Sequence, residues 1–378
     1  MSSREPRVLQ LGFMPLIDSA PLIAAARLGL DRKQGLRFQL QRQASWAAIR
    51  DKLLSGELDA VHALSGLVHG VQFGIGGLQA DMAVLLTLNH NGQSITVSSA
   101  LAREIRAGKS LANAFASLPR RPVFAQTFPT GTHAMWLSYW LASHGVQPLS
   151  DIQNIVMPPP RMADALAAGE LDGYCSGEPW GLQSEALGTG QRIIRSGEIW
   201  ADHPEKVLAC RRDFAELEPE TTIALTAALL AACRWLDDPA HRREAVNWLA
   251  DADVIGLPAE RIEQCLLPAE PSELAAPPLR FHANGAVNMP YLSDGLWFAS
   301  QFHRWGLLTP DVTEQRCEDT IAGVHRIEQY RQAAAHVGVE IPANDRRVST
   351  LCDGMTWTGR DAIAYAESFP LRAPSLRA

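Results

Sequence analysis

The chain has 378 residues, 47% of them hydrophobic, and a formal net charge of −7 at pH 7. This length allows two or three domains with a sizeable core. The acidic balance argues against direct nucleic-acid binding, because neutralising phosphates requires a basic surface. No segment approaches the roughly 18 apolar residues that a membrane-spanning helix needs, so we expect no membrane segment.

The first part of the chain alternates between strand and helix patterns. Strands are predicted over residues 8–13, 36–41, 58–64 and 82–88, and helices over 22–30, 46–54 and 68–73. Ser45 is a candidate N-cap of the second helix, because its hydroxyl can accept a bond from a free N–H group of the first turn. Regular alternation of this kind is typical of a mostly parallel sheet.

A second series follows a polar turn at residues 89–93. Strands are predicted over 94–98, 122–126, 152–157, 171–176 and 192–195, and helices over 133–143 and after 158–160 and 178–180. Beyond residue 218, helices are predicted over 221–235, 242–250, 294–305 and 361–368, and residues 266–290 form a Pro-rich loop. We predict one lobe from residues 1–95 and 200–378, which includes a C-terminal helical extension, and a second lobe from residues 96–199.

One short sequence occurs twice, at residues 53–61 and 166–174, with Gly-Glu-Leu-Asp in both copies. Each copy ends a helix pattern at Gly and begins a strand, since Gly adopts the left-handed conformation that commonly follows a helix. We interpret the repeated acids, Asp59 and Asp172, as turn or cap residues rather than catalytic groups. The repeat predicts two similar α/β lobes around a shared cleft.

No catalytic motif stands out. The sequence lacks the nucleophile elbow, the P-loop, the zinc-binding H-E-x-x-H and the dinucleotide fingerprint after a strand. The six cysteines are scattered without C-x-x-C spacing, which indicates reduced and mostly buried thiols rather than a metal site. We therefore predict a protein that is not an enzyme, with no catalytic residue, no metal and no cofactor.

Several residues are candidates for contact with a ligand, each with an ordinary alternative. Gly131 and His133 lie at the start of a predicted helix, whose free N–H groups and partial positive charge favour anions. The alternative is a plain N-cap followed by an exposed histidine. Trp46 begins another helix and is either a flat apolar wall with an N–H donor or a core aromatic. Gln93 and Lys206 are the last two candidates. The alternative for Gln93 is a solvated loop residue, and the alternative for Lys206 is a surface charge.

The segments that hold these residues resemble a known family. They run in order over roughly residues 8–310: 11–16, 20–22, 44–46, 51–52, 56–60, 91–96, 131–137, 177–180, 203–207, 289–291 and 302–306. They are similar to the nitrate/bicarbonate-binding proteins of ABC-type transport, the NrtA/CmpA-like group. The resemblance implies a type II periplasmic-binding-protein fold, with two α/β lobes around a ligand cleft and extra C-terminal helices.

The resemblance also implies a ligand and its contacts. Nitrate would lie between the lobes, held by Trp46, Gln93, His133 and Lys206, with the backbone near Gly131 close by. A lysine supplies charge, His and Gln supply directed donors, and an indole face excludes water, which suits a flat, singly charged anion. Lys206 would favour nitrate over ligands that are held together with a bound cation.

The N-terminus departs from the transport members, which are exported and usually anchored through a cysteine. Here no signal pattern follows Met1, and the first cysteine is Cys175. This resembles the cytoplasmic NasS-type nitrate/nitrite sensors, which implies control of a NasT-type (ANTAR) RNA-binding antiterminator of nitrate-assimilation genes. Two alternatives stay open: the solute-binding component of an ABC-type nitrate importer, and an enzyme on the same fold, for thiamine-precursor synthesis or desulfonation.

Overall fold

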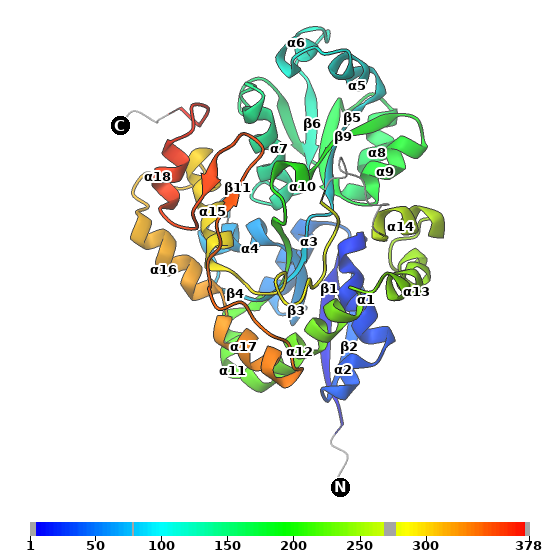
Figure 1. Ribbon diagram of the computed structural model, residues 1–378, viewed down its shortest axis with the longest axis vertical. Helices are drawn as coiled ribbons and strands as arrows, with labels where there is room; N and C mark the ends of the chain where they lie inside the picture. The colour runs from blue at the N-terminus through cyan, green and yellow to red at the C-terminus, as the bar shows by residue number, and fades with distance from the viewer. Residues whose placement is uncertain (1–4, 78, 268–276, 375–378) are drawn as a thin grey trace.

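The computed structural model describes residues 5–77, 79–267 and 277–374. The chain forms two α/β lobes, one above the other along the long axis in Figure 1, each built on a five-stranded sheet. The strand orders are β2-β1-β3-β10-β4 and β7-β6-β8-β5-β9. The two-lobed α/β architecture predicted from the sequence is confirmed.

The first sheet is mostly parallel, as its alternating pattern predicts. Strands β1 and β2 pair in parallel, and β1 and β3 do the same. Strand β10 differs, because it inserts between β3 and β4 and is antiparallel to both. The strands are β1 (Arg7–Phe13), β2 (Leu36–Arg42), β3 (Ala60–Leu64), β4 (Met82–His90) and β10 (Pro204–Arg211). Helices between them are α1 (Ala20–Arg27), α2 (Leu30–Lys33), α3 (Trp46–Ser55) and α4 (Ser65–Gln72), with a 3-10 turn η1 (Ile17–Ser19).

The second sheet repeats this arrangement. Strands β6, β7 and β8 are parallel, and β5 lies between β8 and β9, antiparallel to both. The strands are β5 (Gln93–Ser98), β6 (Val123–Gln126), β7 (Gln153–Val156), β8 (Gly173–Gly177) and β9 (Gly190–Arg195). The helices are α5 (Ser99–Arg106), α6 (Leu111–Ala116), α7 (Thr132–Ser143), α8 (Pro159–Ala167), α9 (Trp180–Ala186) and α10 (Ser196–Ile199). The sequence pattern did not predict α5 and α6.

The repeated sequence marks equivalent positions in the two lobes. Gly56 and Gly169 follow α3 and α8 with φ values of +81° and +75°, as expected for residues that end a helix. Asp59 Oδ2 accepts a bond from the Gln10 amide of β1 at 2.7 Å, and Asp172 Oδ2 accepts one from the Val123 amide of β6 at 2.8 Å. Both acids thus bond to a neighbouring strand, rather than to a turn or a helix cap as the sequence analysis predicts for them.

The C-terminal part is helical, as predicted, and packs against both lobes. Trp297 and Phe298 of α15 share a core cluster with Ile95 of β5 and Trp136 of α7. The helices are α11 (Arg212–Leu217), α12 (Pro219–Trp235), α13 (Pro239–Ala250), α14 (Ala259–Leu266), α15 (Leu292–Arg304), α16 (Glu314–Val324), α17 (Ile327–His336) and α18 (Ala362–Glu367), with short strands β11 (Ser349–Thr350) and β12 (Thr356–Trp357). No helix in the described ranges is long and apolar enough to cross a bilayer.

The predicted lobe limits at residues 95/96 and 199/200 stay a prediction. The chain enters the second sheet with β5 and re-enters the first with β10. The outer ends of the first lobe, residues 1–4 and 375–378, lie outside the described residues, as do residues 268–276 of the Pro-rich loop.

Candidate functional site

A buried ion cluster lies where elements of the two lobes meet. Its centre is Lys206 of β10, whose side chain is fully buried. The Nζ atom lies 2.7 Å from Asp18 Oδ2 and 2.7 Å from Glu205 Oε1. A buried ammonium group is tolerated only when such partners replace its hydration. We call Asp18, Glu205 and Lys206 the ion cluster.

An irregularity in β10 allows neighbouring residues to join this cluster. Successive side chains of a regular strand point to opposite faces of a sheet. The pairing of β10 with β4 shifts register around Lys206, between Pro204 and Val207. Such bulges re-aim side chains, and here Glu205 and Lys206 contact each other through their side chains.

The first turns of α7 hold the carboxylate of Glu205. The Thr132 hydroxyl donates to Oε1, and the indole N–H of Trp136 donates to Oε2 at 2.9 Å. The N-cap of α7 is Gly131, where an added Cβ would lie 2.6 Å from Leu64 Cδ1 of β3. A side chain at this position would therefore displace Leu64, so glycine suits the close approach of α7 to the first lobe.

His133 lies in the first turn of the same helix and is fully buried. Its Nδ1 is 2.6 Å from Thr127 Oγ1, and its Nε2 is 3.4 Å from Glu205 Oε1. Burial holds the pKa of His133 well below its usual value, with a further lowering by Lys206, so the ring is neutral. If the Thr127 hydroxyl donates to Nδ1, the proton of the neutral ring sits on Nε2, which faces the ion cluster.

Asp18 connects both lobes to Lys206. Its Oδ1 lies 2.9 Å from His62 Nε2 of β3, and its Oδ2 accepts from Gln93 Nε2 at 3.4 Å. Gln93 is the first residue of β5, in the second sheet. The Oε1 atom of Gln93 accepts from Ser196 Oγ at 3.1 Å, which fixes the orientation of its amide.

The protonation states follow from burial and these partners. Burial lowers the pKa of Lys206, but Asp18 and Glu205 outweigh it, and the pKa lies above its usual value. Burial raises the pKa of Asp18, but Lys206 and His62 outweigh it, and the pKa lies below its usual value. For Glu205 burial prevails over Lys206, so the pKa is raised. Glu205 is therefore the easier of the two acids to protonate.

Two buried ring nitrogens beside the ion cluster lack a hydrogen-bond partner among the described residues. Trp46 Nε1 and His133 Nε2 have no hydrogen-bond partner within residues 5–77, 79–267 and 277–374. The Trp46 ring centre lies 5.7 Å from Lys206 Nζ. A buried donor left without a partner costs about 1–3 kcal/mol. The arrangement can therefore be completed by a ligand that supplies acceptor oxygens.

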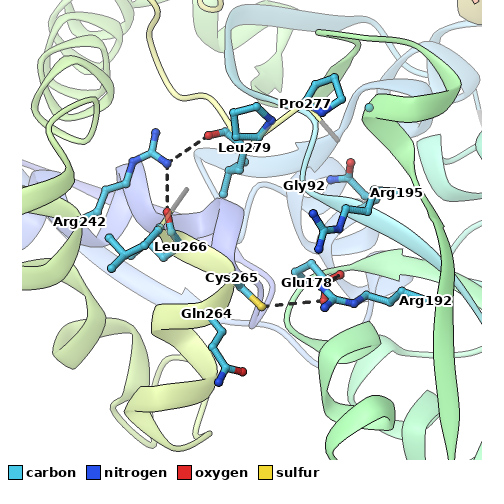
Figure 2. A pocket seen from close by; sticks show the side chains of 14 residues that line it. Gly92, Glu178, Arg192, Arg195, Arg242, Gln264, Cys265, Leu266, Pro277 and Leu279 are labelled. Atoms are coloured by element: carbon cyan, nitrogen blue, oxygen red, sulfur yellow. Dashed lines mark hydrogen bonds and ion pairs between the residues drawn. The ribbon is translucent and has the colours of Figure 1, made fainter. Parts of the chain in front are cut away.

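A cavity of about 90 Å³ adjoins the cluster at Gln93 (Figure 2). Figure 2 shows Arg192 and Arg195 of β9 on one side of it and Gln264 and Cys265 of α14 on the other. Glu178 lies between them, and its Oε1 accepts from Arg192 Nη1 at 3.1 Å. The cavity is thus lined from both lobes and carries more cationic than anionic groups.

The structure brings the predicted side chains together. Trp46, Gln93, His133 and Lys206 are all buried, so the alternatives of a solvated glutamine, an exposed histidine and a surface lysine are wrong. Gly131 lies beside them as the N-cap of α7. Their role as anion ligands stays a prediction.

Asp18, His62 and Glu205 were not singled out by the sequence. Asp18 precedes a proline-containing helix start and resembles a cap, while Glu205 precedes a lysine and resembles half of a surface pair. The signal that could have found them is the crowding of ionisable residues in short segments that are otherwise apolar.

Comparisons with known proteins show which family and which structures the chain resembles. The NMT1-like family matches residues 2–250. The nitrate/nitrite binding protein NrtA of Synechococcus elongatus is 34% identical over 394 residues, which cover 98% of this chain and 87% of the relative. The crystal structure of the periplasmic nitrate-binding protein NrtA from Synechocystis PCC 6803 is similar with a TM-score of 0.89 and 31% identity, over 97% of this chain and 99% of that one.

A longer relative is the nitrate import ATP-binding protein NrtC of Synechocystis sp., at 33% identity over 96% of this chain. The chain spans only 55% of the length of that relative. The similarities confirm the predicted resemblance to NrtA/CmpA-like proteins and the solute-binding fold. They do not test the finer resemblance to NasS-type sensors.

Proposed function

The chain belongs to the NMT1-like family, and from this premise we propose that it binds nitrate or nitrite at the ion cluster between its lobes. The observation that carries the proposal is the pair of buried ring nitrogens, Trp46 Nε1 and His133 Nε2, that have no hydrogen-bond partner among the described residues. The indole nitrogen is a donor, and the imidazole nitrogen is a donor in the tautomer that is protonated at Nε2. Lys206 adds a third donor, because an ammonium group has three N–H bonds and two are directed at carboxylates.

This set of donors favours an anion that only accepts hydrogen bonds. Nitrate and nitrite have no O–H group, whereas bicarbonate has one that needs an acceptor. The two carboxylates nearby are already engaged, Asp18 with His62 and Lys206, and Glu205 with Lys206 and the donors of α7. Bicarbonate would compete with these bonds, so the cluster favours the nitrogen oxyanions.

The donors come from both lobes, so binding would hold the lobes together. Trp46 and Lys206 belong to α3 and β10 of the first lobe, while Gln93 and His133 belong to β5 and α7 of the second. An anion that contacts both sets binds the closed arrangement better than an open one, and shifts the population toward it. We propose that the protein acts through this shift and not through chemistry.

We propose that the shift serves a nitrate/nitrite sensor in the cytoplasm. In this proposal the anion controls a NasT-type (ANTAR) RNA-binding antiterminator, which prefers one arrangement of the lobes. The second candidate is the solute-binding component of an ABC-type nitrate importer. One specific observation supports this second role: the chain is similar to NrtA over nearly its whole length.

Isothermal titration with nitrate and nitrite tests the binding proposal. We expect a Kd of about 1 μM or tighter, equivalent to about −8 kcal/mol, and loss of detectable binding in Lys206→Ala and His133→Ala. A matched control is Lys109→Ala, which removes an exposed lysine of the second lobe. Binding of a sulfonate or an aromatic compound by the wild type, with no response to either anion, contradicts the proposal.

Co-purification separates the two roles. The sensor proposal predicts that the antiterminator is retained on the immobilised protein without nitrate and released by nitrate. The importer proposal predicts instead that transport of nitrate into vesicles containing the permease and ATPase depends on this protein. Cell fractionation, with the protein found in the cytoplasm or outside it, gives an independent answer.

A further inference from the structure

The ion cluster has an excess of negative charge before any ligand enters. Lys206 contributes one positive charge, while Asp18 and Glu205 contribute two negative charges when both are ionised. All three side chains are buried, with at most 2% exposure. A bound anion would raise the excess to two negative charges in a medium where charges are poorly screened, which is strongly unfavourable.

The groups around Glu205 show where a compensating proton can go. Those facing it are Lys206 of β10, His203 just before that strand, Thr132, His133 and Trp136 of α7, and Cys175 of β8, while Asp18 of η1 shares Lys206 with it. Asp18 is held ionised by Lys206 and His62. Burial lowers the pKa of His203 to about 3, so that ring is neutral. Glu205, whose pKa burial raises, is the remaining acceptor.

The partners of Glu205 tolerate either protonation state. When the carboxylate is ionised, the Thr132 hydroxyl donates to Oε1. When Oε1 carries a proton, its O–H group can donate a hydrogen bond to the Thr132 hydroxyl oxygen, since a hydroxyl group both donates and accepts hydrogen bonds. The indole of Trp136 bonds to the other oxygen, Oε2, and is unaffected. Protonation therefore retains the contacts with Thr132 and Trp136, the first with its direction reversed, and Lys206 keeps Asp18 as its ionised partner.

We propose that Glu205 takes up one proton from solvent when the anion binds, and that this residue thereby restricts the site to singly charged anions. The proposal rests on the proposed function. The proton passes from water or buffer to Glu205 Oε1, and no bond of the anion is made or broken. The anion enters as one negative charge, the carboxylate loses one, and the charge of the cluster is unchanged.

The proposal fixes the direction of the pH dependence. The bound anion raises the pKa of Glu205 above its value in the free protein. Between these two values, the Kd for nitrate rises with pH, by up to about tenfold per pH unit. Below the lower value the residue is protonated in both states, and the Kd becomes independent of pH. A doubly charged planar anion such as carbonate is rejected, because one proton does not compensate it.

Titration calorimetry in two cationic buffers with different ionisation enthalpies, Bis-Tris and Tris, at one pH measures the uptake. We expect up to about one proton per nitrate in the wild type at pH values between the pKa of Glu205 in the free protein and its higher pKa in the complex, which a pH series locates. In Glu205→Gln we expect binding with an uptake near zero and a Kd that no longer changes with pH. Glu170→Gln, an exposed acid of the second lobe, is the control and behaves as the wild type.

The outcomes distinguish this inference from the proposed function. No heat of binding with either anion overturns both. Nitrate binding without proton uptake at any pH, or binding that requires a metal ion, overturns only the role of Glu205, and so does uptake that persists in Glu205→Gln. If that variant does not fold, the infrared difference spectrum of the wild type decides: nitrate must produce the band of a protonated carboxyl group, and its absence contradicts the proposal.

Discussion

At the scale of single residues, the ammonium group of Lys206 determines how the buried charges are arranged. It bonds to Asp18 and Glu205, and each of these also accepts from a neutral donor, His62 or Trp136. Every charge of the cluster thus has partners. Removal of Lys206 leaves two acids buried without a cation. Removal of the Asp18 carboxylate takes an acceptor from both Lys206 and His62, and a buried group that loses its partner is costly.

Asp18→Asn should therefore destabilise the fold, by about 3 kcal/mol. The folded pKa of Asp18 lies below its unfolded value of about 3.9, so its contribution is complete above that pH and is lost as the pH falls. Urea unfolding should give the full loss at about pH 7 and a smaller one at about pH 3. Asp51→Asn, at an exposed pair with Arg50, is the control. An equal loss at both pH values contradicts the assignment.

Trp46 offers a test of a single donor. Trp46→Phe retains an aromatic ring next to Lys206 and removes the Nε1–H group together with the rest of the five-membered ring. That N–H group has no acceptor within the described part of the chain. If that group donates to the anion, its loss should weaken nitrate binding about tenfold, or about 1.4 kcal/mol. Titration calorimetry measures the change. Trp248→Phe, on α13 of the first lobe, is the control and should bind nitrate as the wild type does. An unchanged Kd in Trp46→Phe would show that the indole does not contact the anion.

At the scale of elements, closure depends on how near α4 comes to the start of α7. Gly66 and Gly70 lie one turn apart on α4. An added Cβ would lie 2.3 Å from Thr130 O at Gly66 and 2.3 Å from Thr130 Oγ1 at Gly70. Both distances are shorter than contact allows, so the two glycines are required for the approach of one lobe to the other.

Gly70→Ala should therefore hinder closure without touching the ion cluster. We expect the Kd for nitrate to rise at least about tenfold and the radius of gyration from small-angle scattering to increase. Gly77→Ala is the matched control, because a Cβ there meets no atom within 4 Å. A variant that folds normally and binds nitrate with the wild-type Kd excludes this contact as a condition for closure.

At the scale of the whole molecule, the C-terminal segment joins parts that are distant in sequence. Arg347 Nε lies 2.8 Å from Asp294 Oδ1 of α15, and its Nη1 donates to Asp202 O at 2.6 Å, beside the second crossing between the lobes. Tyr139 of α7 donates its hydroxyl to Asp353 at 2.9 Å. Figure 1 shows α15 and α18 together on one side of the molecule. The segment therefore fixes the crossing and the second lobe to the C-terminal helices.

Arg347→Ala should leave Asp294 buried without its partner. Burial already raises the pKa of Asp294, and Arg347 opposes that rise, so loss of the arginine favours the protonated acid. We expect a loss of about 3 kcal/mol in the free energy of unfolding, measured by denaturant titration. Arg360→Ala, at an exposed position, is the control. Equal stability of the two variants would show that the bridge to Asp294 does not support the fold.

The sequence alone determined the elements and their repetition. Apolar periodicity located the strands of the two sheets except β10, and most of the longer helices. Ser45 caps α3 with a bond from the Ala48 amide at 3.1 Å. Gly56 and Gly169 marked equivalent helix ends in two lobes of the same topology. These features are local, since a helix period or a left-handed glycine depends on a few neighbouring residues.

Only the tertiary structure decided which residues meet. Lys206 reaches Asp18 across 188 positions of sequence, and this contact depends on the insertion of β10 into the first sheet. The register shift in β10, where the side chains of Glu205 and Lys206 meet, is not marked by any pattern in the neighbouring sequence. Long-range strand pairing decides burial, and burial turns ordinary charged side chains into a strongly interacting cluster, because charges interact strongly only where water is excluded.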